Sequence, residues 1–376
     1  MNVGIDKIGL YVPRQSLDMT QLALHRGVDP NKYLVGIGQR QMAVVSPAED
    51  IVTMACEAAA QIVKGEIDHI DSLYFATETG MDFSKSAGNH VHRMLGLKTG
   101  VRSVEFKQAC YAATGALQMA CEHVRLYPDK KVLVISSDIA WYGFNTPGEA
   151  TQGAGAIALL VSANPRLALV RPGRFVTEEL ADFYRPSYVE TPIVDGRFSV
   201  QCYTNLLKQL DPNQAYPYVC FHMPFATMAD KANQALAYPI AEDKLKIVKD
   251  YTAVVGNIYN GSLYLSLLSV LANAKEDLAN LTIPLFSYGS GAIAEWFDVK
   301  ILPTYKTVFD GKAINAHLQS RAMIDVETYE HDMATHAKKE KAETYHPTAE
   351  AKAKTPRFIL EAIEKHHRRY TDKLAK

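Results

Sequence analysis

Short apolar runs alternate along the chain with segments whose apolar residues recur every three or four positions. The apolar runs predict buried strands at 3–12, 72–77, 101–106, 131–138, 155–162 and 167–172. Residues 49–64 and 112–124 have helical spacing, and the second of these segments consists largely of small residues. Strands that alternate with helices predict an α/β sheet with crossover connections.

A six-residue motif occurs twice and suggests an internal repeat. Residues 153–158 (GAGAIA) recur as 289–294 (GSGAIA), and each copy follows an apolar strand. The matching context favours two similar α/β halves, 1–170 and 171–376. Residues 174–216 are instead rich in Tyr, Pro and charge, so we expect a cap inserted over a cleft at about that position.

The C-terminal stretch, 331–376, holds 5 of the 12 histidines together with many Lys and Glu residues. A metal-binding tract or an RNA-binding tail would explain the histidines and lysines. Acidic residues lie between the basic ones, however, and this pattern favours a solvated helical region. Phe358, Ile359, Leu360 and Ile363 would tether that region to the body of the protein.

The amino-acid composition excludes several classes of function. With 40 basic and 41 acidic residues and 48% hydrophobic residues, the chain is neither disordered nor broadly basic, which argues against nucleic-acid binding. We expect no secretory signal and no membrane-spanning segment, because no apolar run approaches roughly 18 residues. Five cysteines without a CxxC pair disfavour a disulfide framework or a zinc site. These features predict a cytoplasmic protein with reduced thiols.

Residues 153–158 also fit the GxGxxA pattern of dinucleotide-binding proteins. That motif requires a preceding strand and a following helix. Here residues 157–161 form an apolar run that predicts a strand, so nicotinamide binding is disfavoured. We interpret the glycines as a place where backbone approaches another group closely.

Cys110 lies between an apolar strand and a helix of small residues. A thiol at a helix N-terminus experiences the positive end of the helix dipole, which would lower its pKa and favour a nucleophilic thiolate. A buried cysteine that serves as a small hydrophobe is the alternative, and we assign that role to Cys56, Cys121, Cys202 and Cys220. For Cys110 the residues alone leave both interpretations open.

Four further polar residues stand at the ends of apolar segments or in small-residue turns. His222 ends the short run 218–221, and Glu78 follows the strand predicted at 72–77. Asn257 and Ser290 lie in glycine-containing turns. Taken singly, each is more often a core histidine, a solvated carboxylate or a turn former than a functional residue.

The order of these residues along the chain resembles the order found in the thiolase superfamily. A Cys precedes a helix of small residues, and it is followed by a His in an H-x-P motif, by a G-N pair and by a glycine-rich strand. The closer resemblance is to the hydroxymethylglutaryl-CoA synthase family in its compact bacterial form. Motifs similar to that family span nearly the whole chain; they are Gly27-Val28-Asp29, 32–39, Thr77-Glu78-Thr79, Ala109-Cys110-Tyr111, 137–140, 151–156, 182–186, 192–196, Cys202-Tyr203 and 358–370. The string DFYRP at 182–186 separates the chain from ketoacyl synthases and true thiolases.

The resemblance implies a thiolase-like fold with an αβαβα layer order, and condensation of acetyl-CoA with acetoacetyl-CoA and water. It implies that Cys110 carries the acetyl group, Glu78 acts as general base and His222 binds the second thioester. The amides of Cys110 and 289–291 would hold the oxyanion. The resemblance also implies substrate contacts at Asp29, Tyr142, Asn145, Thr151, Ser199, Lys231, Asn257 and Ser290.

The same resemblance implies a homodimer in the mevalonate pathway, with CoA thioesters as substrates and neither a metal nor another cofactor. Two residues depart from the family pattern. Thr227 stands where many members have a lysine, and Trp141 precedes the tyrosine of the SDIA motif. A synthase that adds β-branches to polyketides from carrier-protein-bound substrates is the main alternative. A non-catalytic scaffold with this fold is a weaker one.

Overall fold

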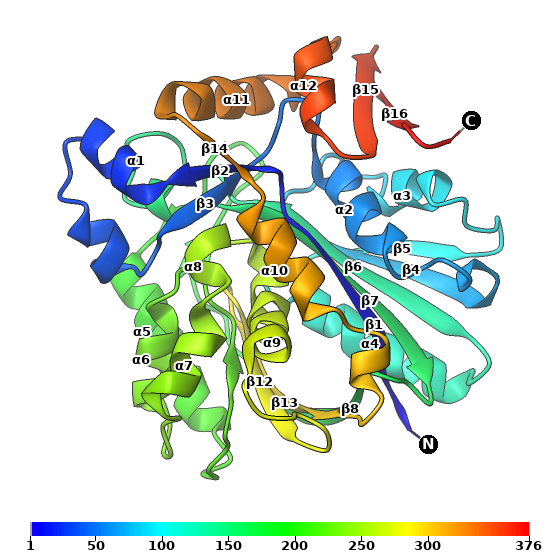
Figure 1. The fold of residues 1–376 in the computed structure, drawn as a ribbon, viewed down its shortest axis with the longest axis vertical. Coiled ribbons are helices and arrows are strands. Elements are labelled where there is room, and N and C mark those ends of the chain that lie inside the picture. Colours follow the sequence, from blue (N-terminus) through cyan, green and yellow to red (C-terminus); the bar gives the residue numbers. More distant parts are fainter. Residues whose placement is uncertain (1, 376) are drawn as a thin grey trace.

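The computed structural model describes residues 2–375, and a nine-stranded sheet runs through the molecule (Figure 1). Its strands are β1 (Val3–Tyr11), β4 (Ile70–Ala76), β5 (Arg102–Phe106), β6 (Lys131–Ile139), β7 (Ala154–Ala163), β8 (Ala168–Thr177), β11 (Cys220–Phe221), β12 (Thr282–Gly289) and β13 (Ile293–Ile301). All six strands predicted from apolar runs are present. The order across the sheet is β5-β4-β6-β7-β1-β8-β13-β12-β11.

The two halves of this sheet repeat the same pairing. In the first half β4 pairs with β6 in parallel, and β7 is antiparallel to both β6 and β1. In the second half β11 and β12 are parallel, and β13 is antiparallel to β12 and β8. The halves meet where β1 pairs with β8, and the sequence repeat falls at the entry to β7 and β13. The boundary expected near residue 170 lies inside β8, which begins at Ala168.

Helices cover the sheet in layers. The main ones are α2 (Ile51–Ala60), α3 (Gly88–Met94), α4 (Ala112–Leu126), α5 (Gly196–Leu210) and α9 (Ser262–Asn273). Alternate residues of β7 face two cores: Ile157 and Leu159 share one with α4, whereas Ala158 and Leu160 share the other with α2. A hydrogen bond from Ser287 on β12 reaches Thr114 on α4, so α4 lies between the two halves. The α5 helix covers the far side of the second half, against β13 and β8.

The remaining elements complete the chain. The helices are α1 (Met19–His25), α6 (Met228–Ala235), α7 (Glu242–Lys249), α8 (Thr252–Val255), α10 (Gly311–Gln319), α11 (Val326–Lys339) and α12 (Ala349–Lys354). The strands are β2 (Gln15–Asp18), β3 (Gln41–Val44), β9 (Phe183–Tyr184), β10 (Ile193–Val194), β14 (Ala322–Ile324), β15 (Phe358–Glu364) and β16 (His367–Asp372). Within residues 2–375, no helix has both the length and the apolar character needed to cross a bilayer.

The region predicted to be a cap, 174–216, has three parts. β8 continues to Thr177, and α5 packs on the sheet as a layer helix, because Tyr203, Leu206 and Leu207 are buried in the core. Only the segment between them, which contains the small β9–β10 sheet, is an excursion from the layers. The Tyr and Pro residues of the sequence mark this excursion, whereas the apolar face of α5 makes 196–210 a layer helix and not part of a cap.

The C-terminal stretch differs from the solvated helical region that we expected. It contains α12 and the end of α11, but β15 and β16 form an antiparallel hairpin that lies beside α2 in Figure 1. Phe358 and Leu360 are buried in the core that contains α2, which confirms the expected tethers. Arg368 and Tyr370 of β16 also contact Asp50, the N-cap residue of α2. Residues 322–372 therefore return to the first half of the molecule.

Candidate active site

Cys110 and Glu78 are in direct contact. The thiol Sγ of Cys110 donates a hydrogen bond to Oε1 of Glu78 over 2.7 Å. Cys110 follows β5 and precedes α4, and Ala109 before it has a positive φ of 44°, an uncommon conformation for a residue with a side chain. Glu78 follows β4, the neighbour of β5 in the sheet. Parallel strands therefore deliver the two side chains to the same edge, although 32 residues separate them.

The expected lowering of the Cys110 pKa is wrong. Burial raises the pKa of the Cys110 thiol well above its usual value, and the Glu78 carboxylate raises it further. The amide of Ala113 in the first turn of α4 donates to Oδ1 of Asn260, so a neutral amide oxygen occupies that helix terminus. The site thus holds a protonated thiol beside a carboxyl group.

Glu78 is a strengthened base. Burial raises its pKa from 4.5 to about 8, and the nearby Asp138 carboxylate adds to the shift. Arg185, whose Nη2 donates to the Glu78 carbonyl oxygen over 2.7 Å, opposes the shift. A carboxylate with this pKa accepts a carbon-bound proton more readily than an ordinary glutamate does.

Asp138 holds the loop that carries Glu78. Its Oδ1 accepts hydrogen bonds from the Thr77 hydroxyl and from the amides of Glu78 and Thr79, at 2.8, 2.8 and 3.2 Å. Its Oδ2 accepts from the side chain of Asn260 at 3.1 Å. Burial raises the pKa of Asp138 to about 6 in spite of these donors. The sequence contained the motif at 137–140, but nothing in it assigned this role to Asp138.

Asp182 organises the other side of the site. This buried carboxylate accepts hydrogen bonds from the Ser199 hydroxyl, the Tyr288 hydroxyl and the Gly291 amide, at 3.1, 2.7 and 3.0 Å. The Gly291 amide therefore already has an acceptor, and the oxyanion role expected for the stretch 289–291 stays a prediction for its other amides and for the amide of Cys110. The carbonyl of Ser290 accepts a hydrogen bond from Gln108 over 3.4 Å, beside the loop of Cys110.

Tyr142, Asn257 and Thr151 meet close to the thiol. The side chain of Asn257 donates to the Tyr142 hydroxyl over 3.0 Å, and its backbone amide donates to the carbonyl of Thr151. Burial raises the pKa of Tyr142, and the nearby Glu78 carboxylate contributes to the shift. Three of the predicted substrate contacts thus lie together, and Tyr142 connects them to the Cys110–Glu78 pair. Asn145, three residues after Tyr142, has a positive φ of 56°.

His222 directly follows β11 and is buried. Its backbone amide donates to the carbonyl of Phe286 on β12, and its own carbonyl accepts from the Tyr203 hydroxyl. Burial lowers the pKa of His222 to about 3, so the imidazole is neutral. Within residues 2–375, Nδ1 has no hydrogen-bond partner, and no bond joins the ring to Glu78 or Cys110. By the pairing of the strands, His222 occupies the place that corresponds to Glu78 in the first half.

A close contact brings the two halves together at the thiol. A Cβ atom on Gly289, at the end of β12, would lie 2.6 Å from Cβ of Tyr111 and 2.8 Å from the carbonyl of Gln108. Only glycine permits this approach. The end of β12 therefore packs directly on the loop that presents Cys110, and His222 follows the adjacent strand β11.

Asp29 and Lys231 lie apart from this cluster. Both are exposed; Asp29 accepts a hydrogen bond from the Asn31 amide, and Lys231 lies over the Phe225 ring at 5.1 Å. At one departure from the family pattern, the Thr227 hydroxyl donates to the carbonyl of Gly36. At the other, Trp141 packs edge-on against Phe144 at 4.9 Å between centroids.

Comparisons with known proteins agree with this architecture. Residues 1–166 match the family described as hydroxymethylglutaryl-coenzyme A synthase N terminal, and residues 225–373 match its C-terminal counterpart. The chain is 42% identical to the hydroxymethylglutaryl-CoA synthase of Enterococcus faecalis over 348 residues, which cover 88% of this chain and 91% of that protein. The chain belongs to the hydroxymethylglutaryl-CoA synthase family.

Solved structures of the family have the same fold. A hydroxymethylglutaryl-CoA synthase complexed with CoA superposes with a TM-score of 0.89 at 35% identity, covering 99% of this chain and 100% of that one. The synthase of the curacin biosynthetic pathway, in complex with an acetyl donor carrier protein, reaches 0.91 at 26% identity over 99% of this chain and 100% of that one. Our prediction of a thiolase-like fold is thus confirmed, as is membership of a family of acyl-transferring enzymes.

Proposed function

We propose that the protein condenses acetyl-CoA with acetoacetyl-CoA and water to give 3-hydroxy-3-methylglutaryl-CoA and CoA. The observation that carries this proposal is the 2.7 Å contact between the Cys110 thiol and the Glu78 carboxyl group. A nucleophile and a base in contact are what an acetyl-enzyme mechanism requires. The identity to the Enterococcus faecalis synthase supports the choice of substrates.

In the first step the Cys110 sulfur attacks the carbonyl carbon of acetyl-CoA. The new sulfur–carbon bond replaces the bond to CoA, and the departing CoA sulfur takes up the proton that the Cys110 thiol loses. The backbone amides of Cys110 and of Gly289 or Ser290 are the candidate donors for the oxyanion in this step. The products are free CoA and acetyl-Cys110.

Acetylation itself prepares Glu78 for the second step. The hydrogen bond from the Cys110 thiol lowers the Glu78 pKa, and this bond is lost once the sulfur carries an acetyl group. Ionised Glu78 then becomes a stronger base and removes a proton from the acetyl methyl group. The resulting enolate carbon attacks the ketone of acetoacetyl-CoA, and Glu78 returns its proton to the new alkoxide. Water finally cleaves the enzyme thioester, which releases the product and restores the Cys110 thiol.

His222 binds the second thioester as a neutral ring. Its low pKa excludes a role as an imidazolium acid near pH 7, but a neutral imidazole still donates one hydrogen bond. A buried ring nitrogen without a protein partner gains a hydrogen bond when a substrate atom binds beside it. This arrangement fits a role in orienting acetoacetyl-CoA.

The acetyl donor distinguishes this function from polyketide β-branching: the proposed reaction uses free acetyl-CoA, and the branching reaction uses a carrier-protein-bound acetyl group. The relative named polyketide biosynthesis 3-hydroxy-3-methylglutaryl-ACP synthase PksG, from Bacillus subtilis, is 29% identical over 98% of this chain and 99% of that protein. We expect a mass spectrum taken after incubation with acetyl-CoA to show one acetyl group on the Cys110 peptide. Acetylation only by an acetylated carrier protein would favour the branching function, and no acetylation by either donor would leave a non-catalytic scaffold.

We also propose a cytoplasmic homodimer that acts without a metal or another cofactor. The free outer edge of β5 supports a dimer, because no further strand pairs with β5 among the described residues. The five free cysteines support a cytoplasmic location, where thiols stay reduced. Hydrolysis, acyl transfer and enolisation at Cys110 and Glu78 all proceed through protein groups alone.

A further inference from the structure

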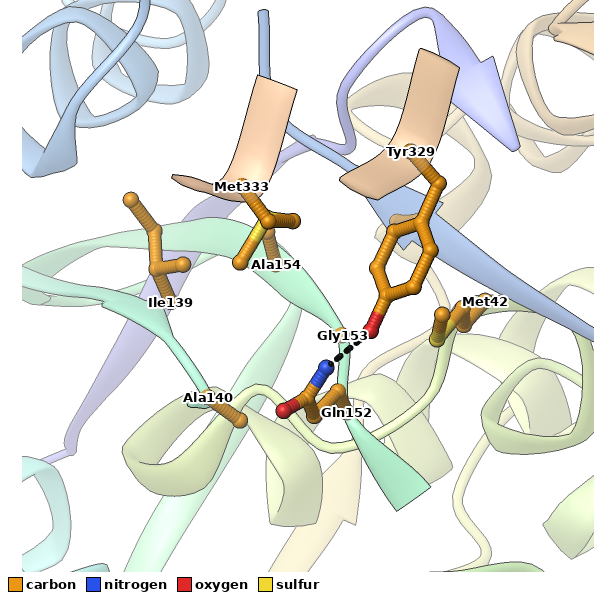
Figure 2. A pocket seen from close by; sticks show the side chains of 9 residues that line it. Met42, Ile139, Ala140, Gln152, Gly153, Ala154, Tyr329 and Met333 are labelled. Carbon is orange, nitrogen blue, oxygen red and sulfur yellow. Dashed lines mark hydrogen bonds between the residues drawn. The ribbon is translucent and has the colours of Figure 1, made fainter. Parts of the chain in front are cut away.

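A single tyrosine hydroxyl of α11 joins two anchors of the loop 140–152. Figure 2 shows the side chain of Gln152 pointing at the Tyr329 hydroxyl, and Nε2 of Gln152 donates to this oxygen over 2.8 Å. The same hydroxyl donates to Oε1 of Glu149 over 3.1 Å. Tyr329, Gln152 and Glu149 are each at most 2% exposed. The Tyr329 hydroxyl thus donates one hydrogen bond and accepts another, and both partners are buried residues of the same loop.

Each of these anchors holds the backbone of a predicted substrate contact. Oε1 of Gln152 accepts a hydrogen bond from the Tyr142 amide over 2.8 Å. Oε2 of Glu149 accepts from the Asn145 amide over 2.8 Å, at a residue whose φ is positive. Left-handed backbone at a residue other than glycine persists only where surrounding contacts enforce it.

The charge of Glu149 is balanced from the N-terminal side of the molecule. Arg26, just after α1, donates to both carboxylate oxygens of Glu149, at 2.7 and 3.0 Å. Arg26 also pairs with Glu330, the neighbour of Tyr329 on α11. Because both Arg26 and Glu149 are almost fully buried, the pair fixes the carboxylate in one position.

The ring of Tyr329 adds an apolar contact to the same loop. It meets the Phe144 ring edge-on at 5.6 Å between centroids, and Phe144 in turn meets Trp141. The unusual Trp141 thus belongs to an aromatic row that ends on α11. Replacing Tyr329 by Phe would keep this ring contact and remove only the two hydrogen bonds of the hydroxyl.

We propose that Tyr329 is a positioning residue, whose hydroxyl sets the places of Tyr142 and Asn145 in the substrate site. This proposal rests on the proposed function. The Cys110–Glu78 pair is held separately, by Asp138 and Arg185, and neither of these contacts Tyr329. The hydroxyl should therefore govern how tightly the thioesters bind rather than how fast the bound thioesters react.

The test compares Tyr329→Phe with Tyr345→Phe as a matched control. Tyr345 lies in the same C-terminal region, and its hydroxyl donates to the Pro47 carbonyl, away from loop 140–152. For Tyr329→Phe we expect the KM values of acetyl-CoA and acetoacetyl-CoA to rise about tenfold, the factor expected if displacement of Tyr142 and Asn145 costs each thioester one hydrogen bond. The rate of Cys110 acetylation at saturation should stay within about twofold of the native protein, whereas Tyr345→Phe should change neither quantity.

A merely structural role predicts a different pattern, because partial unfolding lowers the active fraction and leaves KM unchanged. Unchanged KM values in Tyr329→Phe would therefore overturn the proposal. If that variant does not fold, Gln152→Met removes both the link to Tyr329 and the anchor of the Tyr142 amide with a side chain of similar size, and unchanged KM values in this variant would overturn the proposal as well. A native protein that forms neither acetyl-Cys110 nor product would instead refute the proposed function.

Discussion

At the scale of single residues, Cys110 differs from the other cysteines by its neighbour. Cys121 is fully buried in an apolar core, whereas the thiol of Cys110 contacts a carboxyl group. We predict that Cys110→Ala abolishes both acetylation and product formation, because no other thiol is placed beside a base. Cys121→Ala should retain both activities and lose only thermal stability. Peptide mass spectra after incubation with acetyl-CoA check this, and acetylation that survives in Cys110→Ala would place the nucleophile elsewhere.

Glu78 should be needed for carbon–carbon bond formation and not for acetylation. Its carboxylate raises the pKa of the Cys110 thiol, so Glu78→Ala removes one obstacle to forming the thiolate. We predict that this variant becomes acetylated but forms product about 10²–10⁴-fold more slowly, the range for a lost general base. The measurement is a single turnover with labelled acetyl-CoA followed by acetoacetyl-CoA. Near-native product formation would remove Glu78 from the mechanism.

The raised pKa of Glu78 also sets the sign of the pH dependence. Only the ionised carboxylate removes a methyl proton, and with a pKa of about 8 it is mostly protonated at pH 6.5. We predict that condensation by preformed acetyl-enzyme accelerates from about pH 6.5 to above pH 8, because the pKa of Glu78 rises further once the hydrogen bond from the Cys110 thiol is lost. An ordinary glutamate would already be ionised throughout this range, so a flat profile would contradict the shift. Binding of labelled acetoacetyl-CoA across the same range serves as the control.

The residue roles that the sequence failed to reveal all depend on contacts over long separations. Asp138 acts on Glu78 from 60 residues away, and Tyr329 reaches Gln152 across 177 residues. No local sequence pattern indicates a partner that lies so far away in the chain. Cys110, in contrast, stood at a strand-to-helix junction that was visible locally, although the pKa effect inferred from that junction had the wrong sign.

At the scale of elements, periodicity located the strands because one or both of their faces are buried. The C-terminal hairpin escaped prediction for the opposite reason. Arg368 is a charged residue in a stretch that reads as solvated, yet it pairs with Asp50, 318 residues away in the chain. A run of charged residues indicates a solvent-exposed segment only where no residue distant in the sequence pairs with those charges.

Gly289 tests how closely the two halves must approach at the active site. A methyl group on this residue would meet Tyr111 and Gln108 at under 3 Å, and much of that contact is backbone. We predict that Gly289→Ala displaces the loop of Cys110, lowers kcat by about tenfold or more and reduces stability by about 1–3 kcal/mol. Gly196→Ala is the matched control, because a methyl group there has no neighbour within 4 Å. Kinetics and thermal unfolding of both variants check this, and a fully active Gly289→Ala would show that the contact is not required.

At the scale of the whole molecule, the two halves share the same strand topology but carry different catalytic groups. The strands β4 and β11 correspond, and they are followed by Glu78 and His222. The first half adds β5 and the nucleophile loop, for which the second half has no counterpart among the described strands. The six-residue repeat indicated the two halves correctly, but such a short match could not reveal which half carries which group.

The extra strand β5 forms one edge of the sheet, and this edge supports our final prediction. Val104 in its middle is 43% exposed, and free strand edges tend to pair with another chain. We predict that the native protein has twice the 41.6 kDa mass of one chain in solution. Val104→Glu should shift that mass toward one chain, because the two charges would face each other across a symmetric interface. Leu24→Glu places the same charge on exposed α1 and should leave the mass unchanged. A Val104→Glu protein that keeps the doubled mass would exclude β5 from the interface.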